Sequence, residues 1–276
     1  MLNQFIIKSQ KAISNMNLLK GVLLIVLLVS FSSCDENDDG PKGTTWQLVW
    51  SDEFNDAGAL DEANWTYDLG AGGWGNNELQ NYTSDAENVI VEDGLLKIIA
   101  MESLTSARVK TQGLFSQTYG RFEARIKTPY GPGIWPAFWL LGDRVETVGW
   151  PQSGEIDIME MKGQQPNIIY GSLHAPGNFG SGGITKSFSF QNDRFDADFH
   201  LFAVEWGVDY IDYYVDDTLY QRITPSDVEE WVFNEPFHII LNVAIGGDFV
   251  GFPTSSTPFP QTMEVDYVRV YKELIQ

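Results

Sequence analysis

The chain has 276 residues, with 38 acidic and 17 basic side chains and a formal net charge of −21 at pH 7. Such a surface repels nucleic acid and anionic membranes, so we expect neither as a binding partner. Cys34 is the only cysteine, which excludes a disulfide within the chain. The sequence also contains no His/Cys cluster that could hold zinc.

The first 33 residues have the pattern of a secretory signal peptide. Three lysines precede an apolar run, residues 22–31, and two serines follow it directly before Cys34. The run is shorter than the roughly 20 apolar residues that a membrane-spanning helix needs. We therefore predict a signal peptide over residues 1–33 and an exported protein.

Cys34 resembles the lipidated cysteine of bacterial lipoproteins, although residues 31–33 depart from the usual lipobox. The acidic run that follows, residues 35–39, resembles the surface-export tags of Bacteroidetes lipoproteins; a solvated linker is the alternative. The resemblance implies a lipid anchor at the outer membrane, with display on the cell surface. Residues 34–44 are then a tether, and a single folded domain is predicted over residues 45–276.

Apolar and polar residues alternate through most of this domain, as expected for half-buried β-strands. Residues 89–92 and 95–99 flank Asp93-Gly94, a strong signal for a two-residue hairpin turn. Further strands are predicted at residues 119–128, 202–206, 210–215, 237–245 and 265–271. Helical periodicity is almost absent, with room for one short turn at residues 225–231.

Many short strands separated by Gly, Pro, Asn and Asp predict an all-β fold, a two-sheet antiparallel β-sandwich of the jelly-roll type. Its inner faces form the core, and one concave outer face carries a long cleft. Nine Trp, eleven Tyr and seventeen Phe exceed what such a core needs. Sugar rings stack on indole, so Trp74, Trp135, Trp139 and Trp206 are candidates for a glycan groove, with core packing as the alternative for each.

Residues 154–161 read Gly-Glu-Ile-Asp-Ile-Met-Glu-Met and place three acids in a strand-like segment. Glu155 and Asp157 share one face of a regular strand, whereas Glu160 would face the other way. One extra residue, a β-bulge for which Met159 is the candidate, brings Glu160 back to the first face. Paired carboxylates in a cleft are what retaining glycoside hydrolysis requires; a solvated strand face is the alternative.

The chain resembles glycoside hydrolase family 16, and within it the bacterial laminarinase-type endo-β-1,3-glucanases. Besides the acidic octapeptide, the resemblance is carried by residues 50–54, 74–80, 105–108, 131–141, 171–174 and 263–271. It implies that Glu155 is the nucleophile, Asp157 its electrostatic helper and Glu160 the acid/base. The implied activity is retaining endo-hydrolysis of β-1,3-glucan, a polysaccharide.

The bulged form of the octapeptide favours β-1,3-glucanases over strict lichenases within this resemblance. It leaves open a hydrolase of mixed-linkage β-1,3-1,4-glucan or of an agar-type galactan. A surface glycan-binding protein without turnover is a rival of another class, although a pure binder has no need of three unpaired acids. A structural adhesin explains neither the acids nor the tryptophans.

The resemblance also implies residues that hold the sugar. Trp135 and Trp139 resemble stacking residues, Asn76 and Arg108 resemble partners for sugar hydroxyls, and His174 resembles a histidine beside the acid/base. Each has a plainer alternative: Arg108 could pair with a surface acid, and His174 could cap a strand end.

Glu53, Gly94 and Asp266 resemble a structural calcium site on the convex side of the sandwich. Calcium prefers carboxylate and carbonyl oxygens, which two acids and a hairpin carbonyl would supply. The alternative is an ordinary turn and two solvated acids. We expect no cofactor for catalysis and a monomeric protein.

Overall fold

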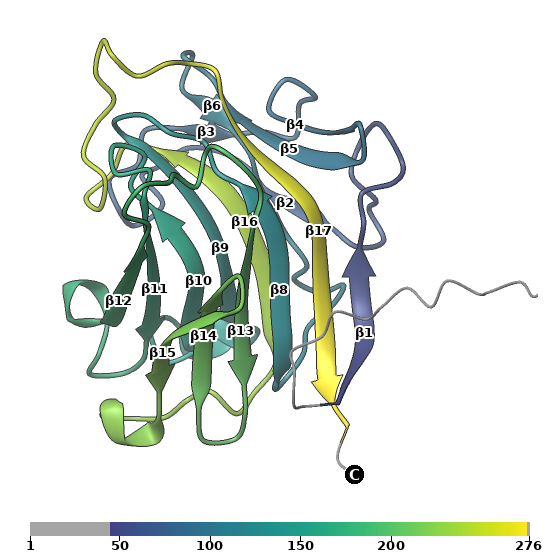
Figure 1. Cartoon of the computed structure of the whole chain (residues 1–276), viewed down its shortest axis with the longest axis vertical. Helices are drawn as coiled ribbons and strands as arrows, with labels where there is room; N and C mark the ends of the chain where they lie inside the picture. The colour runs from purple at the N-terminus through teal and green to yellow at the C-terminus, as the bar shows by residue number, and fades with distance from the viewer. Residues whose placement is uncertain (1–44, 275–276) are drawn as a thin grey trace, which may run out of the picture. The chain divides into compact units, whose positions relative to one another are not determined.

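The computed structural model describes residues 45–274, whose regular secondary structure is almost entirely β-strand (Figure 1). The strands are β1 (Trp46–Asp52), β2 (Thr66–Asp68), β3 (Asn81–Tyr82), β4 (Val89–Glu92), β5 (Leu95–Ala100), β6 (Thr105–Ser106), β7 (Arg108–Lys110), β8 (Gly120–Lys127), β9 (Ile134–Gly142), β10 (Glu155–Met161), β11 (Ile168–His174), β12 (Ile184–Ser189), β13 (His200–Trp206), β14 (Ile211–Val215), β15 (Thr218–Ile223), β16 (Phe237–Ile245) and β17 (Gln261–Glu273). Three short helical segments accompany them: α1 (Val145–Val148), η1 (Gly180–Gly182) and η2 (Pro225–Asp227). Among the described residues, no helix has the length and apolar character needed to cross a membrane.

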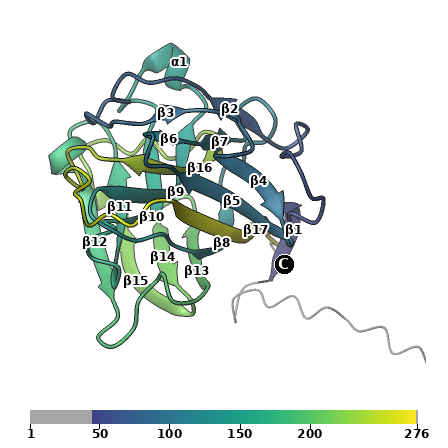
Figure 2. The ribbon, with the colours of Figure 1, turned by 90° about the horizontal axis from the view of Figure 1, so that it is seen from above.

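The strands form two large antiparallel sheets, which confirms the predicted sandwich (Figures 1 and 2). One sheet has the order β15-β14-β13-β8-β17-β5-β4, with β1 paired to β17, and the other has the order β12-β11-β10-β9-β16-β7-β2. A small third sheet pairs β3 with β6 in parallel. Most neighbours in the two large sheets are distant in sequence, so the fold depends on long-range pairing.

The core lies between the two large sheets and follows the predicted alternation. Phe122, Ala124 and Ile126 of β8 are completely buried and belong to the same apolar cluster as residues of β10 and β16, including Ile156 and Leu241. Burying apolar side chains from both inner faces supplies the main driving force for folding. The opposite face of the β10 sheet is thereby left free to carry polar residues.

Most strand predictions are confirmed, with shifted ends. The hairpin of β4 and β5 turns at Asp93 and Gly94, which both have positive φ (58° and 76°), as a type I′ turn requires. The last strand, β17, begins at Gln261 instead of residue 265, because its first residues pair with β5. The predicted turn at residues 225–231 is η2, whereas α1 was not predicted.

Candidate active site

The three acids of the octapeptide lie on the same face of β10, because a β-bulge interrupts the strand. Asp157 pairs with Trp139 of β9 and with Ser172 of β11, and Glu160 pairs with Ala137 and Tyr170. Four residues of β10, 157–160, therefore lie opposite three residues of either neighbour. The predicted bulge is confirmed by this register shift.

The bulge covers two residues, Ile158 and Met159. Against β9 the residue without a partner is Ile158, one position before the predicted Met159, and against β11 neither has a partner. Both side chains are buried in the core, at 1% and 0% exposure. Two successive inward side chains invert the alternation, so Glu160 returns to the face of Asp157.

Gly154 starts the strand directly before Glu155 and has a left-handed backbone, with φ = +76°. A Cβ atom here would lie 2.8 Å from Cζ of Phe237 and 3.1 Å from Cε1 of Phe233. Only glycine fits both the conformation and the contact. The rigid packing of this turn fixes the point at which Glu155 enters the cleft.

His174 and Glu160 mark two ends of the acidic group. The Nε2 atom of His174 lies 3.2 Å from Oδ2 of Asp157 and 3.8 Å from Oε1 of Glu155. Glu160 accepts hydrogen bonds from Nε1 of Trp135 (3.0 Å) and from Oγ of Ser172 (3.4 Å). Glu155 and Asp157 thus share one partner, whereas Glu160 is held by neutral donors.

Burial raises the pKa of Glu155, Asp157 and Glu160, because a charged carboxylate loses hydration in the cleft. The charge of Asp157 further raises the pKa of both glutamates, while His174 lowers both. The hydrogen bonds from Trp135 and Ser172 also lower the pKa of Glu160. Three carboxyl groups this close cannot all be ionised near neutral pH, so protonated and ionised acids coexist.

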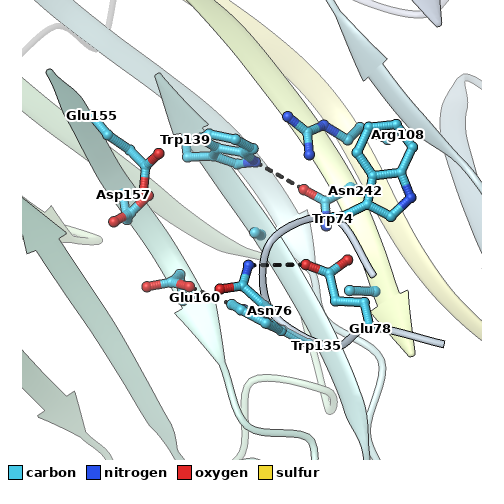
Figure 3. A pocket seen from close by; sticks show the side chains of 12 residues that line it. Trp74, Asn76, Glu78, Arg108, Trp135, Trp139, Glu155, Asp157, Glu160 and Asn242 are labelled. Carbon is cyan, nitrogen blue, oxygen red and sulfur yellow. Dashed lines mark hydrogen bonds between the residues drawn. The ribbon is translucent and has the colours of Figure 1, made fainter. Parts of the chain in front are cut away.

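An aromatic and polar wall faces the acids across the cleft (Figure 3). The guanidinium carbon of Arg108 lies 5.1 Å from the ring centroid of Trp74 and 4.6 Å from that of Trp139. Nε of Arg108 also contacts Oδ2 of Asp68 at 2.9 Å. Trp139 donates its indole N–H to Oδ1 of Asn242 at 2.8 Å. The wall is preorganised, because Arg108 is held by Asp68 and by two indole rings, and Trp139 is held by Asn242.

The segment before β3 contributes a half-buried acid, Glu78, to the same wall. Its two carboxylate oxygens accept hydrogen bonds from Asn76 (3.1 Å) and Gln80 (2.6 Å). Gln80 is itself anchored, because its side-chain oxygen accepts the backbone N–H of Ile245. Burial raises the pKa of Glu78, although hydrogen bonds from Asn76 and Gln80 and the charge of Arg108 oppose the rise. Asn76 therefore reaches the cleft as part of a polar cluster.

A second part of the cleft lies beside His174 and Trp150. Trp150 and Phe179 are 42% and 46% exposed, and their rings meet edge to face at a centroid distance of 5.5 Å. The ring of Trp150 also lies 5.9 Å from that of His174. This part of the cleft has a volume of about 570 Å³ and includes Trp135 and Phe249 at its opposite end.

The structure gathers all eight predicted catalytic and substrate-binding residues around this cleft. They are Glu155, Asp157, Glu160, Asn76, Arg108, Trp135, Trp139 and His174. Arg108 forms an ion pair with Asp68, as the alternative interpretation of this residue expected, but the pair lies at the wall of the cleft. Of the four candidate tryptophans, Trp206 is 2% exposed and belongs to the core.

Several residues of the cleft were not predicted as site residues from the sequence. Asn242 lies in a nine-residue apolar strand that is buried on both faces, where its single amide was the only clue. Ser172 pairs with Asp157 across β10 and β11, and Phe249 packs against Trp135, so only the folded chain brings these two residues to the cleft. Trp150 could have been suspected, because it lies five residues before Glu155, the first residue of the acidic strand.

The residues predicted for calcium lie around β17. Glu53 directly follows β1, Asp266 belongs to β17, and Gly94 lies in the hairpin of β4 and β5, whose second strand also pairs with β17. The carboxylate of Glu53 accepts two hydrogen bonds from Arg269, at 2.9 and 3.0 Å, and Asp266 accepts one from Arg125 at 2.6 Å. A cation would therefore bind backbone oxygens or compete with these arginines.

Comparison with known proteins places this site in a family. The model of glycosyl hydrolases family 16 matches residues 76–269. A β-glucanase of Rhodothermus marinus is 41% identical over 269 residues, which cover 91% of this chain and 93% of the relative. The catalytic domain of an endo-1,3-β-glucanase (laminarinase) from Thermotoga petrophila is 43% identical, with a TM-score of 0.80 over 84% of this chain and all of the other.

An endo-β-1,3-glucanase from Pyrococcus furiosus has the same identity, 43%, and a TM-score of 0.82, covering 86% of this chain and 98% of the other. Both the sequence match and the superposition extend over the sandwich and its cleft. The chain therefore belongs to the glycosyl hydrolases of family 16 and is a glycoside hydrolase.

Proposed function

We propose that the protein hydrolyses internal β-1,3 linkages of a glucan of the laminarin type, with retention of anomeric configuration. The observation that carries the mechanism is the presence of Glu155, Asp157 and Glu160 on one face of β10, inside an aromatic cleft. Two carboxyl groups that flank a sugar are the requirement for double displacement. The β-glucanase relatives support the choice of glucan.

Glu155 acts as the nucleophile in this mechanism and Glu160 as the acid/base. The Glu155 carboxylate attacks the anomeric carbon and forms a glycosyl ester, while the proton of Glu160 passes to the departing glycosidic oxygen. Water then attacks the same carbon, Glu160 takes the proton from that water, and the ester bond to Glu155 breaks. Two inversions at one carbon give net retention.

The surroundings of the two glutamates suit these roles. Burial and the neighbouring Asp157 raise the pKa of Glu160, which keeps it protonated until a leaving group needs the proton. Burial and Asp157 raise the pKa of Glu155 as well, but Nε2 of His174 lies 3.8 Å from its carboxylate, and a positive charge on this imidazole favours the ionised nucleophile. Asp157 lies between the glutamates and acts as a positioning residue for the charge of Glu155.

The cleft supports cleavage inside a chain, because sugar-stacking surfaces lie on both sides of the acids. Trp135 and Phe249 form one such surface, with ring centroids 5.1 Å apart, and Trp150, whose ring packs edge to face against Phe179, forms the other. An indole can stack on the apolar face of a pyranose ring. A polymer that contacts both surfaces must place an internal linkage over Glu155 and Glu160.

The charge of the cleft favours a neutral glycan. Glu78 and Asp248 line it in addition to the three acids, while Arg108 is already paired with Asp68. Sulfate or carboxylate groups on a substrate would be repelled at such a surface. This supports a neutral β-glucan over a sulfated galactan.

Product analysis on four polysaccharides tests the proposal. Purified protein is incubated with laminarin, curdlan, lichenan and agarose, and the products are sized and their anomeric configuration is followed by NMR. We expect mixed oligosaccharides from laminarin, first released as the β-anomer. Oligosaccharides from agarose alone would overturn the choice of glucan.

A Glu155→Ser variant completes this test. It is expected to lose turnover and to keep binding laminarin, which would separate catalysis from recognition. Turnover by this variant at the wild-type rate would reject the assigned nucleophile. Binding of laminarin by the wild type without any product would instead favour a glycan-binding protein.

We further propose that Ca²⁺ stabilises the convex side at Glu53, Gly94 and Asp266. Such an ion would connect the segment after β1 with β17 and the hairpin of β4 and β5, and it would take no part in catalysis. The closeness of these three segments supports the proposal.

The cellular location is proposed from the sequence alone. Cys34 and the signal peptide lie outside the described residues, and we propose that Cys34 carries a lipid anchor at the outer membrane, with the monomeric enzyme at the cell surface. Metabolic labelling with a radioactive fatty acid tests this: label on the wild type and none on Cys34→Ser is expected. Equal labelling of both would reject the anchor.

A further inference from the structure

The catalytic cleft contains a group of ligand atoms that comes from two adjacent strands. Glu155 and Asp157 belong to β10, and His174 is the last residue of β11, directly opposite Glu155. One carboxylate oxygen from each acid and one nitrogen of the imidazole all lie within 4.8 Å of one another. We propose that Glu155, Asp157 and His174 bind a zinc-type transition-metal dication, and that this ion reversibly inhibits the enzyme.

The spacing of the three ligand atoms is close to that of a tetrahedral zinc site. Bonds of about 2.0–2.2 Å in a tetrahedron place the ligands about 3.3–3.6 Å apart. Nε2 of His174 lies 3.2 Å from Oδ2 of Asp157 and 3.8 Å from Oε1 of Glu155. Small rotations of side chains are enough to reach the required distances, and the backbone of both strands can stay in place.

Asp157 provides an independent reason to expect a cation. The residue is only 4% exposed, and among the described residues its Oδ2 atom accepts no well-aligned hydrogen bond, although Nε2 of His174 lies 3.2 Å away. The side chain of Asp157 points into the cleft, and Asp157 lines both parts of the cleft (Figure 3). A buried carboxylate oxygen without a well-aligned donor is costly, and a dication between it and His174 would remove that cost.

The site has three protein ligands and an open fourth direction. Glu160 is not part of the group, because Trp135 and Ser172 hold its two oxygens. The remaining position faces the cavity of about 570 Å³, where water or a sugar hydroxyl can complete the tetrahedron. Entry from solvent is therefore direct.

The donor set selects the type of metal. One imidazole nitrogen and two carboxylate oxygens suit Zn²⁺ and Cu²⁺. Mg²⁺ and Ca²⁺ prefer six or more oxygen ligands and gain little from an imidazole. Mg²⁺ therefore serves as a control for unspecific binding to an acidic protein.

Occupation of the site would stop the reaction at its first step. A metal-bound Glu155 carboxylate cannot attack the anomeric carbon, and the ion occupies space that the reacting sugar needs. Inhibition is therefore competitive with the glycan and is reversed when a chelator removes the metal. This consequence rests on the proposed function, whereas metal binding itself does not.

Isothermal titration calorimetry tests the binding without any substrate. Wild-type protein titrated with ZnCl₂ is expected to show one tight site that Mg²⁺ does not fill. His174→Gln should weaken this site at least about tenfold, since it removes a direct ligand. His200→Gln is the matched control, because His200 also contacts an acid, Asp216 at 3.1 Å, but only one. Equal zinc affinity in all three proteins would reject the site.

Laminarin hydrolysis measured with and without ZnCl₂ tests the inhibition. Each variant is compared with its own zinc-free rate, so a lower basal rate in His174→Gln does not matter. We expect the KM of the wild type to rise with zinc, EDTA to restore it, and His174→Gln to be insensitive. Zinc inhibition of unchanged strength in His174→Gln, or a fall in kcat alone, would contradict the proposal. Protein that binds zinc through His174 but cleaves no glucan would overturn the proposed function and leave the metal site intact.

Discussion

The indole N–H of Trp135 donates a hydrogen bond of 3.0 Å to Oε1 of Glu160. The two residues come from adjacent strands, β9 and β10, and the bulge of β10 is what turns Glu160 toward this donor. The aromatic wall and the acid/base are thereby coupled. The hydrogen bond stabilises the ionised form of Glu160 and so lowers its pKa against the larger effect of burial.

Trp135→Phe keeps an aromatic ring but removes this donor. The pKa of Glu160 should rise, and because the acid/base must be protonated, activity should persist to higher pH. We expect the alkaline limb of the kcat profile to move upward by about one pH unit or less. A pH series on laminarin measures it. Trp139→Phe, which loses a bond to Asn242 instead, should leave this limb in place; a shift of the same size in both variants would contradict the coupling.

Asp157→Asn should stabilise the protein at alkaline pH at the expense of activity. Burial raises the pKa of Asp157 to about 8, so the folded state binds its proton more tightly than the unfolded chain. The free energy of unfolding therefore falls as pH rises from about 4 to about 8, and the amide removes this loss. We expect a gain of about 1–3 kcal/mol at pH 8 and little change at pH 4, measured by urea unfolding.

Asp216→Asn is the control of opposite sign for that experiment. Burial tends to raise the pKa of Asp216, but hydrogen bonds from His200 and from the backbone of Leu201 outweigh it and lower the pKa. The ionised Asp216 stabilises the folded state at pH values above its pKa in the unfolded chain. This stabilisation is lost as the pH falls through its lower pKa in the folded protein. The amide should therefore destabilise at pH 8. A gain in both variants would show that unspecific charge reduction is the cause.

Deletion of Met159 should give a folded protein in which all three acids still face the cleft. The shortened strand reads Glu-Ile-Asp-Ile-Glu-Met and alternates without a bulge. We expect a loss of stability of about 2–5 kcal/mol from the missing buried side chain, together with reduced activity as the glutamate spacing changes. Thermal unfolding and laminarin assays measure both.

Deletion of Ile156 is the matched control for that variant. It removes one residue from the same strand, but it sends Glu155 toward the core, where a carboxylate has no partner. We expect insoluble or unfolded protein. If the Ile156 deletion folded as well as the Met159 deletion, side-chain alternation would not govern this strand.

Glu78→Gln should relax the preference for neutral glucan. The substitution keeps the shape of the side chain and removes a charge from the wall of the cleft. Loss of like-charge repulsion should raise kcat/KM on carboxymethylated laminarin about tenfold relative to native laminarin. Glu230→Gln, at an exposed position that does not line the cleft, should not change the ratio. An unchanged ratio in Glu78→Gln would show that this acid does not select the substrate.

Calcium should raise the melting temperature without changing the rate. A rise of about 4 °C would correspond to roughly 1–2 kcal/mol for a domain of this size. Differential scanning calorimetry with CaCl₂ and with EDTA measures it, and Asp266→Asn should remove the response. Equal melting temperatures of the wild type in both buffers would reject the calcium site.

Local patterns in the sequence were sufficient for the sandwich and for most of the catalytic residues. The hairpin at Asp93 and Gly94 and the buried face of β8 depend on turn chemistry and on a period of two, which neighbouring residues reveal. The acids of β10 were found for the same reason. Even the bulge was predictable, because Glu160 would otherwise have faced the core.

Pairing between strands that are distant in the sequence decided which side chains meet in the cleft, and a local sequence pattern does not contain this information. Asn242 accepts a hydrogen bond from Trp139, and the charge of Arg108 acts on Glu78. These contacts exist because β16, β9, β7 and the segment before β3 meet only in the folded protein. The position of the bulge relative to β9, at Ile158, likewise depends on which residues of the neighbour find partners.

The sequence by itself determined that Glu155, Asp157 and Glu160 share one face of a strand, since alternation and one inserted residue are properties of the segment alone. Only the tertiary structure decided that His174 stands against two of these acids and that Trp135 holds the third. The physical reason is that sheet register brings side chains together across strands, and register is set by burial of the whole inner face.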